Sequence, residues 1–431
     1  MQIDVTKWRL ARGIARHAVR SGRTLWYWLV MATLVLVRPA VQTRLATFRS
    51  ERIGHFISDT DLAFAMLPRL NSSHGGRRLF IYVMPDNSCN EQVRLMYIRS
   101  VQCIPGAKLL DCRQSLVGRL LLGPTQRLTE RVQVDGRPNK YFCGSLHPAG
   151  LDAVGLRPNG RPYLCHSDDD ERRARRELEP LGLPDGVPYA CIHIRDSAYL
   201  ESVLHYKSWA YHDYRNPPLD SYTPAINHLL DRGFAVVRMG KVSSGKLNIN
   251  HPLYFDYSRW NGRSDLLDTF IYSRAYVAVA GSASGTDQLA LAFRVPFLCT
   301  NFVPFEEPRW AVDVSVTIPC LIREADSGEL LPLSRMLESR FFSSASYSEA
   351  GLEVVYNTPS QILDALHETL MRIDGQWNPT SEDVKLQRKF WRWAEHQGIR
   401  GHLPSGPWDE DHYRSSLGTS FLREYTRLLL S

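Results

Sequence analysis

The stretch of sequence that decides the fold covers residues 188–216, which begin PYACIHIRDSAYL and end HDYRN. Residues 189–194 are apolar and rich in β-forming residues, and this run ends abruptly at Arg195 and Asp196. Such a pattern predicts a buried parallel strand. Open α/β sheets bind their ligands at the carboxyl ends of such strands, and the planar guanidinium of an arginine there suits a phosphate or a carboxylate. A strand that merely ends in a surface ion pair is the alternative.

The second half of the chain alternates predicted strands and helices at short spacings. Strands are predicted at residues 188–194, 234–239, 276–280 and 296–300, and helices at residues 222–231, 264–274, 286–293 and 358–371. The last helix is expected to be capped at Thr358, with Pro359 at its first position. This alternation indicates a parallel doubly wound sheet, so the chain is expected to be an α/β protein. In the first half, a strand is predicted at residues 79–84 and a helix at 92–100, and Asp59 or Thr60 is expected to cap a helix that follows a loop.

The length of 431 residues exceeds what one hydrophobic core normally serves, so two domains are expected. Residues 167–171 (SDDDE) open a charged helix, where helix capping explains the acids better than a metal site does. The sequence LPDG at 183–186 then breaks the chain. We therefore expect an N-terminal segment at 1–50, an N-terminal domain at 51–185, a C-terminal domain at 186–373 and a helical extension at 374–431.

The net charge of +7 and the pI near 9.0 favour anionic partners. Many of the bases precede the first domain, at Lys7, Arg9, Arg12, Arg16, Arg20, Arg23, Arg38, Arg44, Arg49 and Arg52. The apolar run at 25–37 is shorter than the ~20 residues that cross a bilayer. We expect residues 7–52 to bind an anionic membrane surface, with the protein cytoplasmic and peripheral on the inner face of the cell membrane. An amphipathic helix packed on the protein's own body is the alternative.

The eight cysteines form no C-x-x-C pair, which predicts reduced, buried thiols rather than disulfides or a zinc site. The sequence contains no H-E-x-x-H, Walker or G-x-G-x-x-G motif, and we expect neither a metal nor a bound cofactor. It also lacks interleaved aromatic and basic residues, so no nucleic acid is expected as a partner.

A second candidate site element is the sequence GSASGTD at 281–287, which joins a predicted strand to a helix. Glycines and small hydroxyl residues let backbone N–H groups point at an anion, and the helix dipole adds to the attraction. A plain turn capped by Ser284 or Thr286 is the alternative. Together with Arg195, this loop is predicted to hold a diphosphate and to stabilise its charge as it leaves, in place of a metal ion.

Several further residues have both a functional and a structural interpretation. His193 alternates with Ile192 and Ile194, and it is either a base or donor contact or a hydrogen-bonded core histidine. Asp196 either accepts a proton from a sugar hydroxyl or orients Arg195. The DYRN sequence at 213–216 is either a sugar and phosphate contact or turn chemistry. The pair Ser264 and Asp265 either holds a ribose or caps a helix, and capping is favoured.

Seven ordered motifs resemble a family of bacterial glycosyltransferases that typically occur among genes for surface polysaccharides. They are RIGHF at 52–56, HIRDSAYL at 193–200, DYRN at 213–216, AVVRMG at 235–240, SASG at 282–285, VVYNTPSQI at 354–362 and SFLRE at 420–424. The H-x-R element also resembles that of fucosyltransferases, whose arginine contacts the donor diphosphate. The resemblance implies a GT-B architecture, with two Rossmann-like doubly wound domains facing a cleft and the C-terminal helices returning to the first domain.

The expected function is metal-independent transfer of a hexosyl or deoxyhexosyl group from a nucleotide-sugar to a lipid-linked or polysaccharide acceptor. The nucleotide-sugar is a co-substrate. Asp196 or His193 is the expected base if the reaction inverts the anomeric centre, and Gly54 and His55 are expected on the acceptor side. The predicted substrate-binding residues of the donor domain are Arg195, Tyr199, Arg215, Asn216, Arg238, Ser282, Ser284, Gly285 and Thr286.

Two other functions fit the same sequence. One is a sugar-nucleotide epimerase, which shares the fold but does not need an N-terminal anchor. The other is a non-catalytic two-domain protein that binds carbohydrate or nucleic acid.

Overall fold

The computed structural model describes residues 5–72, 77–135, 137, 139–144, 162–203, 210–282, 284–303, 314–339, 341, 343–396 and 416–429. Within these ranges, side chains are not described at 5–20, 68–72, 199, 200, 203, 337–339 and 393–396. The chain divides into two compact units. Unit 1 comprises Met1–Asn90 and Arg94–Gly150, and unit 2 comprises Glu91–Val93 and Leu151–Ser431.

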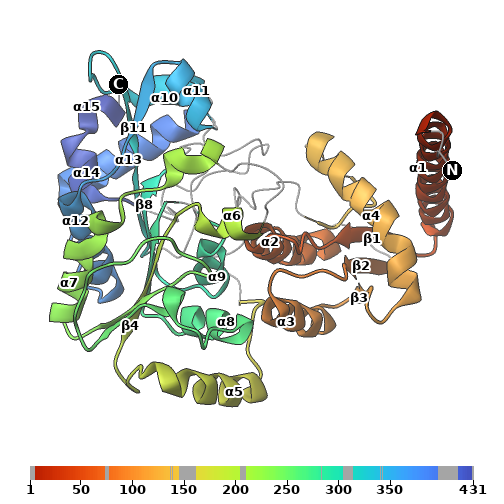
Figure 1. Cartoon of the computed structure of the whole chain (residues 1–431), viewed down its shortest axis with the longest axis horizontal. Coiled ribbons are helices and arrows are strands. Elements are labelled where there is room, and N and C mark those ends of the chain that lie inside the picture. Colours follow the sequence, from red (N-terminus) through yellow and green to blue (C-terminus); the bar gives the residue numbers. More distant parts are fainter. Residues whose placement is uncertain are drawn as a thin grey trace. The chain divides into compact units, whose positions relative to one another are not determined.

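Unit 1 is built on a three-stranded parallel sheet in the order β1-β2-β3. A helix follows each strand, which is the Rossmann-like alternation (Figure 1). The elements in chain order are α1 (Val5–Val37), β1 (Gln42–Thr47), α2 (Ile53–Ser72), β2 (Arg78–Met84), α3 (Glu91–Gln102, which begins in residues grouped with unit 2), β3 (Ala107–Asp111) and α4 (Leu116–Asp135).

An aromatic cluster forms the centre of unit 1. The ring of Phe48, just after β1, lies 5.7 Å from the ring of Tyr82 on β2 and 6.1 Å from that of Phe56 on α2. Phe64 on α2 and Tyr97 on α3 complete the cluster. The cluster holds α2 and α3 against the sheet.

Helix α1 packs against α4, and the indole N–H of Trp26 donates a hydrogen bond to the carbonyl of Leu120 (2.8 Å). Among the helices described here, none combines the length and apolarity that a membrane span requires.

Unit 2 contains a seven-stranded parallel sheet in the order β12-β9-β8-β7-β4-β5-β6 and a two-stranded antiparallel sheet of β10 and β11. The strands are β4 (Tyr189–Ile194), β5 (Ala235–Arg238), β6 (Tyr254–Phe255), β7 (Val277–Gly281), β8 (Phe297–Phe302), β9 (Val316–Pro319), β10 (Leu321–Glu324), β11 (Leu352–Val355) and β12 (Ser416–Leu417). The α-helices are α5 (Asp168–Leu178), α6 (Ala198–Val203), α7 (Thr223–Asp231), α8 (Asp265–Ser273), α9 (Asp287–Ala292), α10 (Leu333–Ser339), α11 (Ser344–Glu349), α12 (Pro359–Ile373), α13 (Ser381–His396), α14 (Thr419–Glu424) and α15 (Thr426–Leu429). Short 3-10 turns lie at Glu179–Leu181, Ala210–Arg215, Leu219–Tyr222 and Tyr257–Arg259.

The strand order of the large sheet reverses beside β4. From β4 the chain adds β5 and β6 on one side, and it then returns to add β7, β8 and β9 on the other side. This is the doubly wound arrangement predicted from the sequence. Ligands of such sheets bind outside the carboxyl ends of the two strands that flank the reversal, which here are β4 and β7.

The two faces of β4 are covered by different helices. Ala190, Ile192 and Ile194 belong to the apolar core that includes residues of α7 and α12. On the other face, the Tyr189 hydroxyl and the Cys191 thiol both donate to the carbonyl of Ile271 on α8. This alternation leaves His193 on the α8 side, as the sequence predicts.

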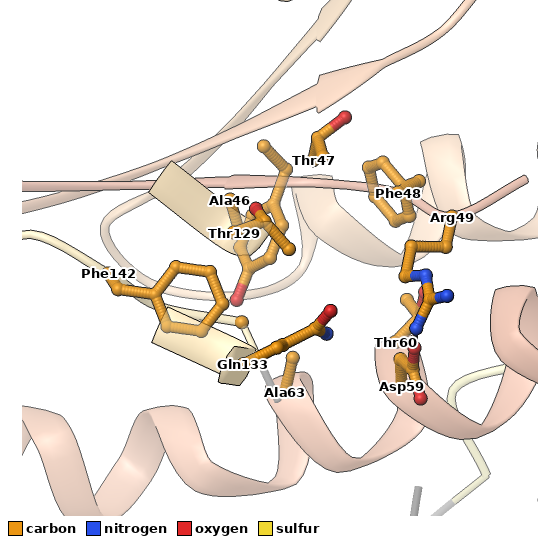
Figure 2. A pocket seen from close by; sticks show the side chains of 12 residues that line it. Ala46, Thr47, Phe48, Arg49, Asp59, Thr60, Ala63, Thr129, Gln133 and Phe142 are labelled. Atoms are coloured by element: carbon orange, nitrogen blue, oxygen red, sulfur yellow. Dashed lines mark ion pairs between the residues drawn. The ribbon is translucent and has the colours of Figure 1, made fainter. Parts of the chain in front are cut away.

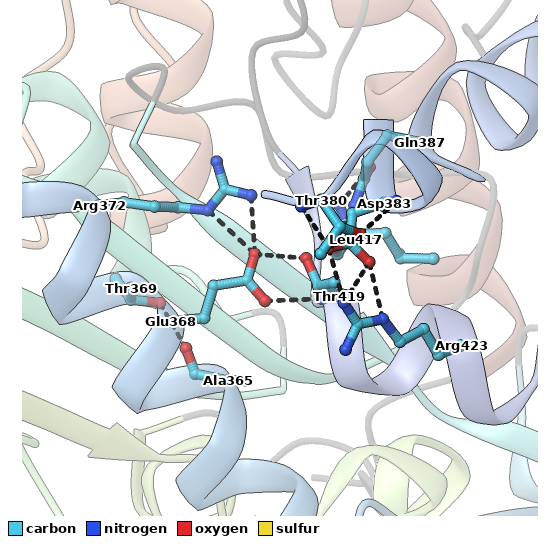
Figure 3. Close-up of polar contacts among 10 residues, drawn as sticks. All are labelled: Ala365, Glu368, Thr369, Arg372, Thr380, Asp383, Gln387, Leu417, Thr419 and Arg423. Carbon is cyan, nitrogen blue, oxygen red and sulfur yellow. Dashed lines mark hydrogen bonds and ion pairs between the residues drawn. The ribbon is translucent and has the colours of Figure 1, made fainter. Parts of the chain in front are cut away.

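The C-terminal elements complete unit 2, and Figure 3 shows the polar contacts that hold them. Glu368 on α12 accepts hydrogen bonds from the backbone N of Thr419 (2.6 Å) and from Nε of Arg372 (2.9 Å). Asp383 on α13 accepts two hydrogen bonds from the guanidinium of Arg423 on α14. In the described part of the chain, α13 and α14 pack on one another and α14 packs on α12, while β12 pairs with β9. The expected return of the C-terminal helices to the first domain stays a prediction.

Three predicted boundaries are wrong. Helix α2 begins at Ile53, so Asp59 and Thr60 lie inside the helix and do not cap it. The helix starts this early because Phe56, in its first turn, packs into the aromatic cluster. Strand β1 lies within the segment expected to precede the first domain. Helix α5 belongs to unit 2 rather than to the first domain, because it packs on α8 and Glu177 accepts a hydrogen bond from Ser264 (2.9 Å).

The predicted helix caps are confirmed at three positions. Ser167, Ser264 and Thr358 each accept a hydrogen bond from a backbone N–H of the first turn, and Pro359 occupies the first turn of α12. The eight cysteines all lie in the described part of the chain and form no disulfide; five of them are buried, whereas Cys103 and Cys165 are exposed.

Close packing at the end of β7 requires a glycine at position 281. A Cβ atom there would lie 2.7 Å from the hydroxyl oxygen of Tyr222 and 3.2 Å from the Cα atom of Ile194. We expect Gly281→Ala to lower the free energy of unfolding by about 1–3 kcal/mol through overpacking. Gly123→Ala is the matched control, because nothing lies within 4 Å of its Cβ position on α4. Equal melting temperatures of the two variants would contradict this account.

Candidate functional site

The loop that follows β7 meets the end of β4 directly. The backbone N of Arg195 donates a hydrogen bond to the carbonyl of Gly281 (3.2 Å). The next residue, Ser282, has a φ of 75°, and its backbone N donates to the carbonyl of Thr300 (2.8 Å). The predicted proximity of Arg195 and the loop is therefore present at the reversal of strand order.

Two features of Ser282 are energetically unfavourable when no ligand is bound to the loop. Its left-handed backbone is strained for a residue other than glycine, at a cost of about 1–3 kcal/mol. Its side chain is fully buried, and no described group forms a hydrogen bond with its Oγ. Strain and an unsatisfied polar group of this kind cluster at binding sites, because a ligand can supply the missing partner.

Ser284 organises the rest of the loop through Asp287. The carboxylate of Asp287, which is buried, accepts hydrogen bonds from the backbone N (2.5 Å) and from Oγ (2.9 Å) of Ser284. Thr286 Oγ1 lies 2.8 Å from the same Oγ. A local turn network therefore ties down Ser284, but the expected side-chain cap is not formed, because Thr286, the N-cap residue of α9, makes no capping hydrogen bond. The anion role of the loop stays a prediction.

The same network fixes the proton on His193. Its Nδ1 lies 3.2 Å from Ser284 Oγ and 3.9 Å from Oδ1 of Asp287. Because the single hydroxyl proton of Ser284 goes to Asp287, the hydrogen bond between His193 and Ser284 requires Nδ1 to be the donor. Nε2 then carries a lone pair. Burial lowers the pKa of His193 from its ordinary 6.5 to about 4, so the ring is neutral at pH 7.

Arg195 is held at one nitrogen. Its Nη1 donates to Oδ1 of Asn216 and to the carbonyl of His212 (3.2 Å). Within the described ranges, Nε and Nη2 have no hydrogen-bond partner. Asn216 in turn donates from Nδ2 to the carboxylate of Asp213 (2.9 Å). The DYRN segment thus positions Arg195, a role that the sequence did not indicate.

A second arginine adds positive charge at this point. Burial and, next in size, the charge of Arg215 lower the pKa of Arg195 from 12.5 to about 10. The carboxylates of Asp213 and Asp196 act in the opposite direction. Each of these two partly buried guanidinium groups makes the charged form of the other less favourable. A bound anion would stabilise both charges.

Asp196 and Arg238 support a neighbouring loop. Oδ2 of Asp196 accepts hydrogen bonds from the hydroxyl of Ser243 and from the backbone N of Ser244, both at 2.9 Å. Buried Arg238 donates to the carbonyl of Gly245 (2.8 Å) and forms an ion pair with Asp256 (3.1 Å). Oδ1 accepts a hydrogen bond from the backbone N of Ala198 (3.2 Å). The hydrogen-bond partners of Asp196 are therefore Ser243, Ser244 and Ala198 rather than Arg195.

The remaining predicted site residues are Gly54, His55, Tyr199 and Gly285. Gly54 and His55 lie in the first turn of α2 in unit 1, where His55 Nδ1 is 3.6 Å from Oδ2 of Asp59. The side chain of Tyr199, on α6, lies outside the described residues. Gly285 is part of the loop and accepts a hydrogen bond from the backbone N of Gln288 (3.3 Å).

Asp287 is the main residue that sequence reasoning missed. Asp287 is the first residue of α9, and its carboxylate accepts hydrogen bonds from the backbone N and Oγ of Ser284, three residues earlier in the sequence. Among the described residues, no group of three or more His, Cys, Asp or Glu side chains is placed to hold a metal ion.

Comparison with known proteins gives only distant similarity. No protein-family model and no curated protein matches the sequence. Among solved structures, the chain is similar to a glycosyl transferase family 9 protein from Veillonella parvula DSM 2008, with 10% identity, coverage of 60% of this chain and 80% of that one, and a TM-score of 0.32. It is also similar to the ADP-heptose LPS heptosyltransferase II of E. coli (12% identity, 60% and 84% coverage, TM-score 0.32). A third similar structure is the iron-containing dodecameric glycosyltransferase TibC from enterotoxigenic E. coli H10407 (15% identity, 60% of each chain, TM-score 0.31). Scores at this level do not support a conclusion about activity.

The depressed pKa of His193 predicts a pH dependence of stability. Between pH 6.5 and pH 4 the unfolded chain binds a proton at this residue that the folded chain does not, so the folded state loses stability as the pH falls through that window. The full loss is roughly 3 kcal/mol, since each pKa unit corresponds to about 1.36 kcal/mol. His193→Gln should therefore show a smaller fall in melting temperature between these pH values than the wild type. Parallel profiles would show that burial does not depress this pKa.

Proposed function

We propose that this protein is a glycosyltransferase of the GT-B type that transfers a sugar from a nucleotide-sugar donor, which unit 2 binds. One observation carries the proposal. Arg195, Arg215 and the loop after β7 lie close together at the point where the strand order of the sheet reverses. The motifs that resemble bacterial glycosyltransferases include these same residues.

The chemistry of the site fits a diphosphate leaving group. When the bond between the anomeric carbon and the diphosphate oxygen breaks, the electron pair leaves with that oxygen, and a nearby guanidinium stabilises the new charge. Arg195 retains Nε and Nη2 for two parallel hydrogen bonds to phosphate oxygens. Ser282 Oγ, buried and without a described partner, supplies a further donor. In this proposal the arginines provide the positive charge that a metal ion provides in other transferases.

His193 is the better of the two predicted bases. A base must present an unprotonated atom to the acceptor hydroxyl, and Nε2 of neutral His193 satisfies this requirement. Asp196 already accepts hydrogen bonds from Ser243 and Ser244. The proposed acceptor is a lipid-linked sugar or a polysaccharide of a bacterial surface glycan.

The proposal predicts that donor binding depends on Arg195. Loss of charge-assisted hydrogen bonds of about 1.5–3 kcal/mol should weaken the binding of the preferred nucleotide-sugar by roughly 10- to 100-fold in Arg195→Ala. The measurement is a thermal-shift titration against UDP-, GDP-, dTDP- and CMP-sugars, because a ligand of the folded state raises the melting temperature.

Arg195→Lys and Arg259→Ala are the matched variants for this test. Lysine keeps the charge but not the forked donors, so it should restore binding only in part. Arg259 is exposed in a 3-10 turn of unit 2, and its removal should have no effect. If no nucleotide-sugar shifts the wild type, or if Arg195→Ala binds as tightly as the wild type, the proposed donor site is wrong. Conversion of the donor sugar without any acceptor would identify an epimerase instead.

We further propose that α1 and α4 attach unit 1 to an anionic membrane surface on the cytoplasmic side. Each of these two adjoining helices exposes several apolar side chains, which are Leu25, Trp28, Leu29 and Leu36 of α1 and Leu116, Val117 and Leu120 of α4. The guanidinium of Arg131 lies 5.7 Å from the ring of Trp28, so positive charge accompanies the apolar groups. Arg44 and Arg49, which the sequence assigned to the same surface, belong instead to β1 and to a pocket of unit 1.

Flotation with phosphatidylcholine vesicles that contain phosphatidylglycerol tests this attachment. The double variant Trp28→Ser, Leu36→Ser should bind these vesicles more weakly than the wild type, because apolar area no longer enters the interface. Val242→Ser, which removes an exposed apolar residue of unit 2, is the control. Equal binding of all three proteins would contradict the proposal, as would a dimer that dissociates only in the double variant, because a second copy would then cover this surface.

A further inference from the structure

Two unpaired polar atoms in unit 1 have a simple explanation. Nη1 of Arg49 and Oδ2 of Asp59, which lie 3.5 Å apart, line a pocket beside the end of β1 (Figure 2). The cavity volume is about 20 Å³, which is room for about one water molecule, and a water bonded to both atoms satisfies them. The pocket is too small for a sugar or a nucleotide. Ser282 of unit 2 differs, because a network of buried side chains holds its strained backbone in place.

Strand β8 contains one extra residue next to the loop that follows β7. Its pairings with β9 advance by three residues on β8, from Cys299 to Phe302, but by only two on β9. Asn301 lies inside this bulge, where it has a φ of 51° and is fully buried. Asparagine adopts the left-handed region more readily than most residues, and bulges often redirect side chains beside active sites.

Asn301 is tied to Asn357, which lies between β11 and α12. The backbone N of each residue donates a hydrogen bond to Oδ1 of the other, at 2.5 and 2.6 Å. Nδ2 of Asn357 donates to the carbonyl of Pro319 at the end of β9 (2.8 Å). Asn357 therefore holds the carboxyl ends of β8 and β9 together. It belongs to the motif VVYNTPSQI at 354–362, for which the proposed donor site has so far given no role.

The reciprocal bonds fix the direction of a hydrogen-bond chain that leads to β7. Because Oδ1 of Asn301 accepts from Asn357, its Nδ2 is the atom that donates to the hydroxyl of Tyr222 (2.7 Å). The hydroxyl of Thr300 donates to the carbonyl of Ala280 (3.0 Å), so the Tyr222 hydroxyl must donate to Oγ1 of Thr300 (2.6 Å). The chain is buried and runs in one direction, so each bond strengthens the next.

The chain ends beside Ser282. The carbonyl of Thr300 accepts a hydrogen bond from the backbone N of Ser282 (2.8 Å). A Cβ atom on Gly281 would lie 2.7 Å from the hydroxyl oxygen of Tyr222, so the residue before Ser282 also packs directly on the chain. A left-handed serine persists only where its surroundings over-determine its conformation, and these two contacts supply that constraint.

We propose that Asn301 and Asn357 are positioning residues of the donor site. Through Thr300 and Tyr222 they hold Ser282 in the conformation in which its Oγ has no partner among the described residues. The inference rests on the proposed function, in which this Oγ donates to the diphosphate of a nucleotide-sugar. Both asparagines act through Ser282 and do not themselves contact the donor.

Amide hydrogen exchange tests the support of the loop without any ligand. Asn357→Ala removes the bonds to the Asn301 amide and to the Pro319 carbonyl. The amides of residues 282–287 should then exchange at least about tenfold faster than in the wild type, while those of α8 keep their rates, because the opening is local. Asn250→Ala, which removes an exposed amide side chain of unit 2, is the control and should match the wild type.

A double-mutant cycle shows whether Asn357 acts through Ser282. The probes are UDP-, GDP-, dTDP- and CMP-sugars, titrated by calorimetry below the melting temperature of every variant. Asn357→Ala should weaken the binding of the preferred nucleotide-sugar about tenfold, and Ser282→Gly, which loses Oγ but is not strained at this φ, should do the same. In the Ser282→Gly background, Asn357→Ala should have little further effect, whereas a general structural defect would multiply the two losses.

Tyr222→Phe gives the same comparison where Asn357→Ala does not fold, because it removes a single oxygen atom from the chain. Three results would overturn the inference: wild-type exchange of the loop in both variants, unchanged donor binding in both, or losses that multiply in the cycle. If the wild type binds a nucleotide-sugar and Asn357→Ala binds it as tightly, the proposed function stands and only the positioning role fails. If the wild type binds none of them, the proposed function fails and the positioning role fails with it.

Discussion

The parallel pairing of β4 with β7 is the constraint on which the rest of unit 2 depends. Ile194 pairs in register with Gly281, and the amide of Arg195 continues the ladder by one bond to the Gly281 carbonyl. Neighbouring strands lie about 4.8 Å apart, so the segments that leave these two strands begin side by side. Because β5 and β6 lie on one side of β4, the chain after β7 departs in the opposite direction, which is the arrangement at which sheets of this kind bind their ligands.

The residues near the carboxyl ends of β4 and β7 are held by contacts that leave some of their polar atoms without a hydrogen bond. The amide of Asn216 orients Arg195, and the carboxylate of Asp287 orients His193 through Ser284. Other nitrogen atoms of Arg195 and His193 stay available to a ligand. Such preorganisation reduces the reorganisation that accompanies ligand binding, which is how polar groups become effective in a site of low dielectric constant.

The elements of unit 2 that were predicted correctly are those whose local sequence pattern agrees with their packing in the fold. The β4 run, the strand ending at Gly281 and the caps at Ser264 and Thr358 all have strong local signals. β1 was missed because it is short and contains Arg44, and its place is set by pairing with β2. The pairing of β4 with β7 could not be read from the sequence either, since strand order depends on contacts between distant residues. The partners of Asp196 are Ser243 and Ser244, which are far away in the sequence.

The last strand of the large sheet has a consequence for how the protein is made. β12 consists only of Ser416 and Leu417, yet it covers the outer edge of β9. Until these residues have left the ribosome, that edge presents unpaired amide and carbonyl groups to other nascent chains. A chaperone that shields β9 during synthesis would therefore increase the yield of folded protein. A protein cut before residue 416 would tend to associate through this edge.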